Sequence, residues 1–497
     1  MVVKRTGDRT PMSIAQRALW LVEQTMPGTA AYNVPVGVRL DGDLDVLRLK
    51  RAIGRVVARH EILRTTFPQA PAQEPDQRIG PRAEPDLPLT DLSHESPGRG
   101  EALAARLLQR WADEPFDLVA GPLIRTRLIR LAAGRHVLGI VMHQLVCDGP
   151  SIHLLFDELA GAYAEEADLP PLPVQFADYA AWQRGRPADT DGLAWWGEQL
   201  DGAPTLLPLP TDRPHPPSRG PAGATCTHLL PGPLMTEAFA LARRLRVTPF
   251  ALTLAAYAAL LGRLTGSRDL LIGTPVNGRL SAELDPLIGF FVNTLPVRAD
   301  LSGDPAFGEL ARRVHRRVLD LLGHQEVPFE KLVELLAPDR GPSHTPLVQT
   351  YFTFESTPLA DPRLPGLAAT LVDVMPSAAK VDLDLMIVRT AAGRDDFQLS
   401  ITYSTDLFHA TTISALADRF HRVLAAGVAD PGVPLRSLPV LADAERRTIL
   451  GQWNAAPPVA GAALVHEGFA SRAADAPDAL AVRADGVTRT FGEVRER

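Results

Sequence analysis

The sequence predicts an α/β fold built from two similar halves, and three observations lead to this prediction. Alternating or mostly apolar runs, which are typical of strands, are interspersed with stretches of helical periodicity. The chain, at 497 residues and 45% hydrophobic, is too long for one ordinary core. Proline-rich stretches at 169–185 and 207–223 interrupt the pattern, so we place a boundary between the halves near residue 180.

The expected helices and strands are mixed in both halves. In the first half we expect a helix over 44–63, strands over 63–67, 122–131 and 136–146, and a helix over 151–167. In the second half we expect helices over 192–202, 236–266 (two) and 307–336 (two), a strand and turn over 269–279, and strands over 346–356, 382–393 and 396–408. The run at 136–146 is mostly apolar, as in a strand that is buried on both faces.

The last part of the chain changes character. The halves are expected at 1–180 and 181–445, and a linker is expected at 446–463, where the small-residue stretch "WNAAPPVAGAA" is typical of a linker. Residues 464–497 begin a new pattern of helix and hairpin and then stop. We therefore expect them to be the truncated start of another domain.

Composition excludes several classes of protein. The net charge of −7 comes without a basic block or an acidic tail, so we expect no nucleic acid partner. Two cysteines cannot form a disulfide framework, and neither a signal peptide nor a membrane span is visible, so we expect a cytoplasmic protein with no membrane partner. Only four residues are lysine, against a Lys plus Arg total of 51, which makes Schiff-base chemistry a poor fit.

The strongest chemical candidate is "MHQLVCDGPS", Met142 to Ser151, at the end of the expected buried strand. A neutral imidazole such as that of His143 can act as a base or hydrogen-bond acceptor near neutral pH. Asp148 and Gly149 permit a sharp turn, and a buried carboxylate needs a cationic or hydrogen-bonding partner. The plainer interpretation is a core histidine with satisfied hydrogen bonds, followed by an ordinary turn.

Other chemistries have weaker support from the same segment. His143, Asp148 and His153 could be mixed metal ligands, but no HExxH or CxxC spacing accompanies them. Cys147 could be a nucleophile, but the sequence places no base beside it. The chain contains no GxSxG, no Gly-Lys dipeptide and no GxGxxG, so hydrolase, nucleotide triphosphatase and dinucleotide-binding hypotheses lack a motif.

Two further segments carry polar residues. "RHEILRTTF" contains Arg59, His60, Glu61 and Arg64, for which a helix end with solvated charges is the plainer interpretation. "IGFFVNTLPVR" is apolar enough for an ordinary core segment, but Asn293 within it would need a hydrogen-bond partner.

Seven blocks in order make the chain resemble the condensation domain of nonribosomal peptide synthetases, over about residues 9 to 445. The blocks are "SIAQRALW", "RHEILRTTF", "MHQLVCDGPS", "FADYAAWQ", "IGFFVNTLPVR", "HQEVPFEKLVE" and "HTPLVQTYF". The first block and "YNVPVGVRLDGDLD" are most similar to the subtype that joins an L-donor to an L-acceptor. The tail, with "RTFGEVRER", resembles the start of an adenylation domain.

The resemblance implies a fold and an activity. The fold would be two chloramphenicol-acetyltransferase-like lobes arranged as a V with a central tunnel. Donor and acceptor peptidyl carrier proteins would deliver thioesters on phosphopantetheine arms, and the acceptor α-amine would attack the donor thioester to form an amide. The resemblance implies an adjoining adenylation domain, no metal, and no cofactor bound by the chain itself.

The resemblance also assigns roles within the motif. His143 matches the first histidine of the family's HHxxxDG core, and Gln144 stands where the second, tunnel-facing histidine would be. Asp148 and Gly149 match the rest of the core. The family pairs this aspartate with an arginine of the second lobe, and the matching residue is Arg279.

Gln144 is a departure from the family pattern. A glutamine amide cannot take a proton, but it can accept a hydrogen bond from an attacking amine, and proximity could carry much of the rate. We expect the Gln144 side chain to face the tunnel and His143 to turn into its lobe. Arg279, Arg64 and Asn293 are expected to support the site.

Three other functions stay open. A catalytically silent scaffold could recruit a tailoring enzyme, a variant could modify the tethered residue, for example by dehydration, and a coenzyme-A-dependent acyltransferase could share the fold. The adenylation-like tail argues against the last of these. Sequence alone does not identify the donor and acceptor substrates.

Overall fold

In the computed structural model the chain forms two compact units, Met1–Val440 and Leu441–Arg497. The structure describes residues 2, 4–5, 10–68, 75–82, 84–164, 170–336, 341, 343–357, 359–390, 396–455, 464–484 and 486–496. Three expected segments lie partly outside the described residues: 165–167 of a helix, 391–393 of a strand and 456–463 of the linker.

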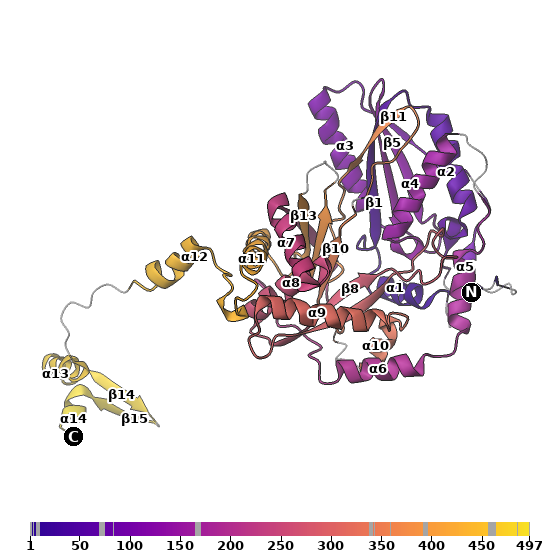
Figure 1. Ribbon diagram of the computed structural model, residues 1–497. Coiled ribbons are helices and arrows are strands. Elements are labelled where there is room, and N and C mark those ends of the chain that lie inside the picture. The colour runs from indigo at the N-terminus through magenta and orange to yellow at the C-terminus, as the bar shows by residue number, and fades with distance from the viewer. Residues whose placement is uncertain are drawn as a thin grey trace. The chain divides into compact units, whose positions relative to one another are not determined.

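The first half of the larger unit is built on a five-stranded sheet with the order β11-β1-β6-β5-β4. Its strands are β1 (Asn33–Gly42), β4 (Leu89–Asp91), β5 (Ile124–Ala132), β6 (Arg135–His143) and β11 (Leu367–Val372). The helices α2 (Val46–Arg59) and α4 (Gly149–Tyr163) pack on one face of the sheet, and α3 (Pro97–Ala112) covers the other (Figure 1). After Arg135, every residue of β6 is buried, which explains its mostly apolar sequence.

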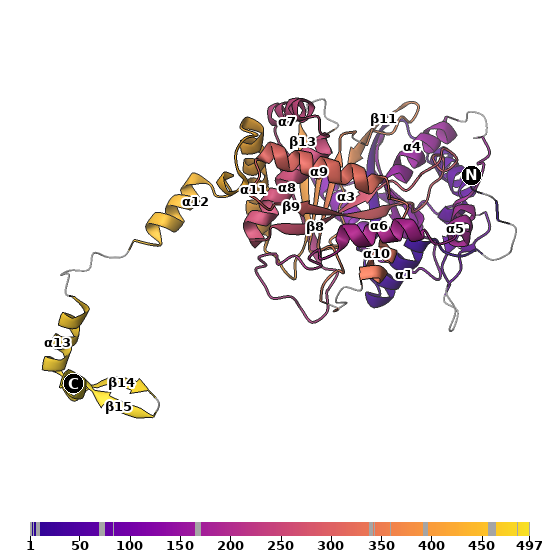
Figure 2. The same cartoon turned by 60° about the horizontal axis from the view of Figure 1, so that its bottom comes forward.

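The second half is built on a six-stranded sheet with the order β7-β13-β12-β10-β8-β9. Its strands are β7 (Gly223–Leu230), β8 (Asp269–Val276), β9 (Asn293–Asp300), β10 (Thr350–Glu355), β12 (Leu383–Arg389) and β13 (Phe397–Ser404). The helices of its core are α7 (Gly232–Leu245), α8 (Pro249–Thr265), α9 (Phe307–Leu322) and α11 (Ala410–Ala429). The helix α8 is the most deeply buried of these, and Figure 2 shows α9 running beside β9.

Several segments tie the two halves together. The strand β11 belongs to the second half in sequence, but it pairs with β1 of the first sheet, where Val372 lies opposite Gly37 (Figure 1). Buried apolar residues from 284–291 also pack into the first core. The helix α5 (Phe176–Gly185) packs in the first core and α6 (Thr190–Leu200) in the second, so the boundary expected near residue 180 falls inside α5.

Shorter elements complete the two units. In the larger unit they are α1 (Ile14–Thr25), η1 (Glu61–Arg64), β2 (Thr65–Thr66), β3 (Arg78–Ile79), η2 (Gln144–Val146), α10 (Phe329–Leu336) and η3 (Leu435–Ser437). In the smaller unit they are α12 (Asp443–Arg447), η4 (Thr448–Gln452), α13 (Val465–Asp475), β14 (Leu480–Ala484), β15 (Val487–Thr490) and α14 (Phe491–Arg495).

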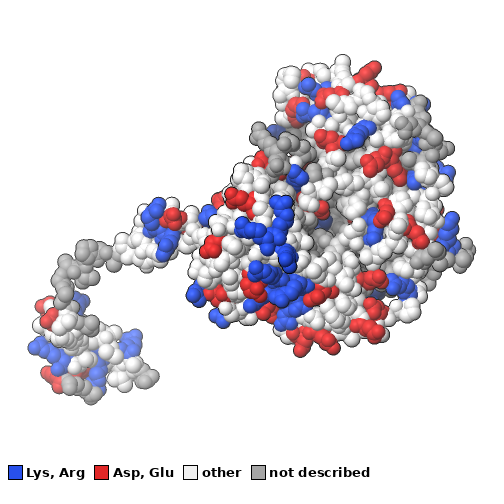
Figure 3. Space-filling view, in the orientation of Figure 1, with Lys and Arg blue, Asp and Glu red and all other residues white. Residues whose placement is uncertain are grey.

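Helix length and surface charge both bear on the expected partners. Among the described residues no single helix is long and apolar enough to cross a membrane. The helices α7 and α8 would together be long and apolar enough, but they are bent by 104° relative to each other. On the face drawn in Figure 3, charges of both signs are scattered over most of the surface, and Lys and Arg gather in one patch near α8 and α9, with acidic residues beside it. On α9, nitrogens of Arg312, Arg313 and Arg316 all lie within 3.7 Å of Glu309, so this helix carries mixed charge rather than an unbroken basic stripe.

Removal of Leu441–Arg497 should leave the main thermal unfolding transition almost unchanged. These residues form a compact unit of their own, and α12 near their start buries none of its residues. Scanning calorimetry measures the transition. A chain cut after Ala429 is the control, because it also loses Leu435 and Leu438, which are only 5% and 2% exposed, and its transition should move clearly downward. An equal drop in the first truncation would contradict the division into two units.

Candidate active site

The loop that follows β6 is held from one side by α1. Gln16 and Glu23 lie two turns apart on that helix, so their side chains share one face. Gln16 Nε2 donates to the carbonyl oxygen of Leu145 at 2.9 Å, and Glu23 Oε1 lies 3.2 Å from His143 Nε2. Ser13 caps α1 and forms a reciprocal capping box with Gln16, which fixes the first of these two anchors.

The His143 side chain is held within this loop by contacts at both ring nitrogens. Its Nδ1 accepts a hydrogen bond from the backbone N–H of Leu145 at 3.2 Å, so in the neutral ring the proton sits on Nε2 and is donated to Glu23. The side chain is 1% exposed, and the edge of the Phe116 ring meets it with 5.9 Å between centroids. Both ring nitrogens are therefore engaged within the first half, and neither is free to meet a substrate.

Asp148 braces the loop from the other side. Its carboxylate caps α4 by accepting from the Ser151 backbone N–H at 3.1 Å and from the Ser151 hydroxyl at 2.6 Å. Arg279 binds the same carboxylate through two parallel hydrogen bonds of 2.8 and 2.9 Å, and the backbone N–H of Phe291 adds a third contact at 3.1 Å. The Asp148 and Arg279 side chains are 0% and 2% exposed. This buried pair joins the first half to a segment of the second.

Between His143 and Gly149, the two residues that keep exposed surface are Gln144 and Gly149. The backbone N–H of Gln144 donates to the carbonyl oxygen of Tyr32 at 2.8 Å. Its side-chain Oε1 accepts from Lys380 Nζ at 2.7 Å. A Cβ added to Gly149 would meet no heavy atom within 4 Å, so the loop borders open space at this residue.

Sequence reasoning missed Lys380. This residue lies just before β12, and its Nζ sits 5.5 Å from the centroid of the Tyr32 ring. Asp384, one residue into β12, acts electrostatically on the same ammonium group. The one signal in the sequence that could have indicated Lys380 is the rarity of lysine in the chain. This rarity is explained equally well by the overall composition.

Arg64 and Asn293, which were expected to support the site, bind other parts of the fold. The Arg64 guanidinium donates to the carbonyl oxygen of Gly80 and lies 3.8 Å from Glu61. The Asn293 amide donates to the carbonyl oxygens of Gln325 and Val327, both at 2.8 Å, and so fastens the start of β9 to the turn before α10.

The weaker chemical alternatives gain no support from the described residues. No group of three or more His, Cys, Asp or Glu side chains in the described ranges is placed to hold a metal ion. Cys147 is buried and its Sγ donates to the carbonyl oxygen of His143 at 3.6 Å. Burial raises the pKa of the Cys147 thiol, which disfavours the thiolate that a nucleophile needs.

A family model described as "Condensation domain" matches residues 7–450. The chain belongs to the condensation-domain family. It is 38% identical to chondramide synthase cmdD of Chondromyces crocatus, over 99% of this chain and 13% of that protein. It is 37% identical to a linear gramicidin synthase polypeptide of Brevibacillus parabrevis, over 98% of this chain and 6% of that protein. This condensation domain thus spans a small part of the length of these curated relatives.

Solved structures are similar over most of the condensation domain. The X-domain from teicoplanin biosynthesis superposes with a TM-score of 0.79 at 31% identity, over 88% of this chain and 99% of that chain. AB3403, a four-domain nonribosomal peptide synthetase bound to AMP and glycine, gives a TM-score of 0.82 at 23% identity, over 99% of this chain and 38% of that chain, and so shows the fold alone. The predicted chloramphenicol-acetyltransferase-like α/β fold is confirmed. In this family the phosphopantetheine is carried on carrier-protein domains, and the condensation domain binds no cofactor itself.

Replacing Asp148 with alanine should lower the free energy of unfolding by about 3–5 kcal/mol, because Arg279 would keep a buried positive charge without its partner. Chemical denaturation measures this loss. Asp157→Ala, at an exposed position on the same helix, is the matched control and should change stability by less than about 0.5 kcal/mol. Equal stability of Asp148→Ala and the control would show that the pair does not brace the loop.

His143→Ala should destabilise the fold more than Gln144→Ala does, by about 1–3 kcal/mol. The first change removes two buried hydrogen bonds and leaves Glu23, 8% exposed at its side chain, without its imidazole partner. The second change removes a half-buried amide. Urea unfolding of both variants at pH 7 gives the comparison, and the reverse order would mean that Gln144 rather than His143 holds the loop.

Proposed function

We propose that the chain forms an amide bond between a donor acyl thioester and the α-amine of an acceptor amino acid, each delivered by a carrier protein. The observation that carries this proposal is the loop from His143 to Gly149, locked by two sets of buried contacts and bordering open space at Gly149. Membership of the condensation-domain family supplies the reaction class. A tunnel between the halves stays a prediction, as does a cytoplasmic location.

The arrangement suits a reaction driven mainly by positioning. An amine attacks a thioester with little help from a base, so holding the two carriers' groups in register supplies much of the rate. In this proposal His143 and Asp148 hold the loop, while Gln144 meets the acceptor amine. None of the three needs to change its protonation state, because both His143 nitrogens and the Asp148 carboxylate are engaged elsewhere.

The finer assignments rest on motif similarity. We propose an L-donor and L-acceptor subtype from "SIAQRALW" and "YNVPVGVRLDGDLD", and the start of an adenylation domain from "RTFGEVRER". Alignment with the synthetase relatives over 98–99% of this chain supports the second assignment. The partners would be donor and acceptor carrier proteins and the adjoining adenylation domain.

A second candidate function is a silent scaffold that recruits a tailoring enzyme. Two observations favour it: Gln144 replaces the family's histidine, and the chain is 33% identical, with a TM-score of 0.78, to the X-domain in the complex of the X-domain and OxyB from teicoplanin biosynthesis. In this case the loop would keep its structural contacts and lose its chemistry.

A single-turnover assay should separate the two functions. Donor and acceptor carriers are loaded with a panel of L-amino acids and mixed with the chain, and intact-protein mass reports dipeptide on the acceptor carrier. The condensation proposal predicts product above a control without the chain, and Gln144→His should keep or raise the yield. Product with neither form across the panel would contradict condensation and favour the scaffold. Product with the histidine form alone would mean that the chain as it stands is inactive.

A further inference from the structure

Gln144 stands where the family has its second histidine, and a lysine from the second half of the domain, Lys380, contacts it. Lys380 Nζ contacts Gln144 Oε1 at 2.7 Å, and Gln144 occupies the position of the family's second histidine. A substrate amine that hydrogen-bonds to Gln144 Oε1 therefore lies beside Lys380 Nζ. None of the other three described lysines shares this environment, since Lys4 is exposed, Lys331 pairs with Glu334 on α10 and Lys50 lies 3.7 Å from Glu84.

The segment that carries Lys380 is firmly anchored. Ala379, 2% exposed, donates its backbone N–H to the Pro221 carbonyl oxygen at 3.0 Å and accepts from Arg219 Nη2 at 2.8 Å. These bonds fix the backbone next to Lys380. The lysine therefore approaches Gln144 from a defined position, which lowers the entropy lost when its side chain makes a contact.

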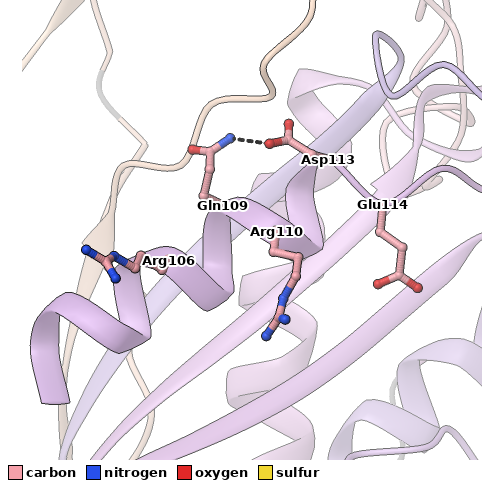
Figure 4. Close-up of a pocket in the computed structure, with 5 residues that line it drawn as sticks. All are labelled: Arg106, Gln109, Arg110, Asp113 and Glu114. Atoms are coloured by element: carbon pink, nitrogen blue, oxygen red, sulfur yellow. Dashed lines mark hydrogen bonds between the residues drawn. The ribbon is translucent and has the colours of Figure 1, made fainter.

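A second anchor lies at the C-terminal end of α3. Gln109 and Asp113 hydrogen-bond to each other there, beside a surface hollow of about 690 Å³ that Arg106, Arg110 and Glu114 also line (Figure 4). Gln109 Nε2 donates to the Met375 carbonyl oxygen at 2.8 Å, and Asp113 Oδ1 accepts from the Ser377 N–H at 2.7 Å. The first half thus holds the segment that leads to Lys380.

The surroundings of Lys380 disfavour the charged form of its amine. Burial lowers the pKa of Lys380, and the opposing pull of the Asp384 carboxylate does not cancel this effect. Burial also raises the pKa values of Tyr32 and Cys147, so both stay neutral and add no charge to the site. A lysine whose pKa is lowered by its surroundings can act as a general base.

Further described titratable groups lie on β10 and directly before β12. Tyr351 lies opposite Asp384 in the parallel pairing of β10 and β12, and burial raises its pKa to about 12. Directly before β12, Asp382 Oδ1 lies 3.7 Å from Arg219 Nε. Burial raises the pKa of Asp382 to about 6. Above that pH the Arg219–Asp382 pair carries no net charge.

We propose that Lys380 is the proton acceptor of the amide-forming step, and this role rests on the proposed condensation function. The α-amine nitrogen attacks the thioester carbonyl carbon, a C–N bond forms, and one proton passes from that nitrogen to the neutral Lys380 Nζ. The C–S bond then breaks, and the proton passes from Nζ to the departing thiolate sulfur. Gln144 holds the amine beside Nζ without taking part in the proton transfer.

The protonation state of Lys380 can be measured without any substrate. Reductive methylation with ¹³C-formaldehyde labels the four lysines and keeps their charge, and the methyl signals are followed by NMR from pH 6 to 11. The signal lost in Lys380→Arg should titrate below the usual range of a lysine. Lys331→Arg, at an exposed position, is the control for assignment. Titration of Lys380 in the usual range would overturn the proposal.

The single-turnover rate then tests the role itself. For the unsubstituted chain it should rise with pH through the Lys380 pKa. Lys380→Met should lose that limb and fall about a hundredfold, and Lys380→Arg should stay equally low because a guanidinium does not deprotonate. Lys331→Met is the matched control and should keep both rate and profile, and thermal melts check folding.

Two outcomes separate this role from the proposed function. Full activity of Lys380→Arg, or a rate that falls as pH rises, would show that a fixed positive charge suffices and would overturn the proton-acceptor role alone. Absence of product from the unsubstituted chain, with Lys380 found neutral by NMR, would overturn condensation and with it the catalytic role.

Discussion

The buried pair of Asp148 and Arg279 is the interaction on which the rest of the site depends. It joins the N-terminus of α4 in the first half to the turn after β8 in the second, with both side chains almost fully excluded from solvent. A pair of this kind adds little net stability over an apolar replacement, but loss of one partner is costly because the other charge stays buried. Its value here is positional. It fixes where the loop after β6 stands relative to β12, and so where Gln144 stands relative to Lys380.

The opposite end of the loop is held by α1 through Gln16 and Glu23. Together the two braces engage His143 and Asp148 in the fold and leave Gln144 as the polar side chain of the loop that faces the other half. An amide at this position can orient an amine but cannot accept its proton. In the proposed condensation step the proton therefore needs another acceptor, and Lys380 is the titratable side chain in direct contact with Gln144.

Sequence patterns predicted the parts of the fold whose local signal is strong. The apolar run of β6 and the periodicity of α4 predicted the strand, turn and helix around the motif. A strand that is buried on both faces is apolar along its whole length, so its sequence is easy to recognise. The strand β11 escaped prediction because "LAATLV" is short, and its pairing with β1 joins residues more than 300 positions apart. Arg279 came from family resemblance, and its contact with Asp148 is a tertiary one that no spacing in the chain encodes.

Lys380 shows the same limit of sequence-based prediction at the proposed active site. Its neighbours in sequence are buried alanines and a strand start, and nothing in "SAAKVDLD" points across to residue 144. Arg64 and Asn293 show the converse, since both lie in family-like blocks yet bind Gly80 and the turn before α10. A polar residue in a family-like block can stabilise the local fold instead of contributing to the candidate site. The sequence does not distinguish these two roles.

A double-substitution cycle at positions 144 and 380 tests most directly whether the two residues act as one unit in place of an imidazole. Condensation rates are measured for the unsubstituted chain, Gln144→His, Lys380→Met and the combined form, with the same loaded carriers. If Gln144 and Lys380 together replace the family's histidine, Gln144→His should make the rate independent of Lys380, so the combined form should match Gln144→His alone. If the combined form instead falls by the same factor as Lys380→Met, the two positions act independently and the account is contradicted.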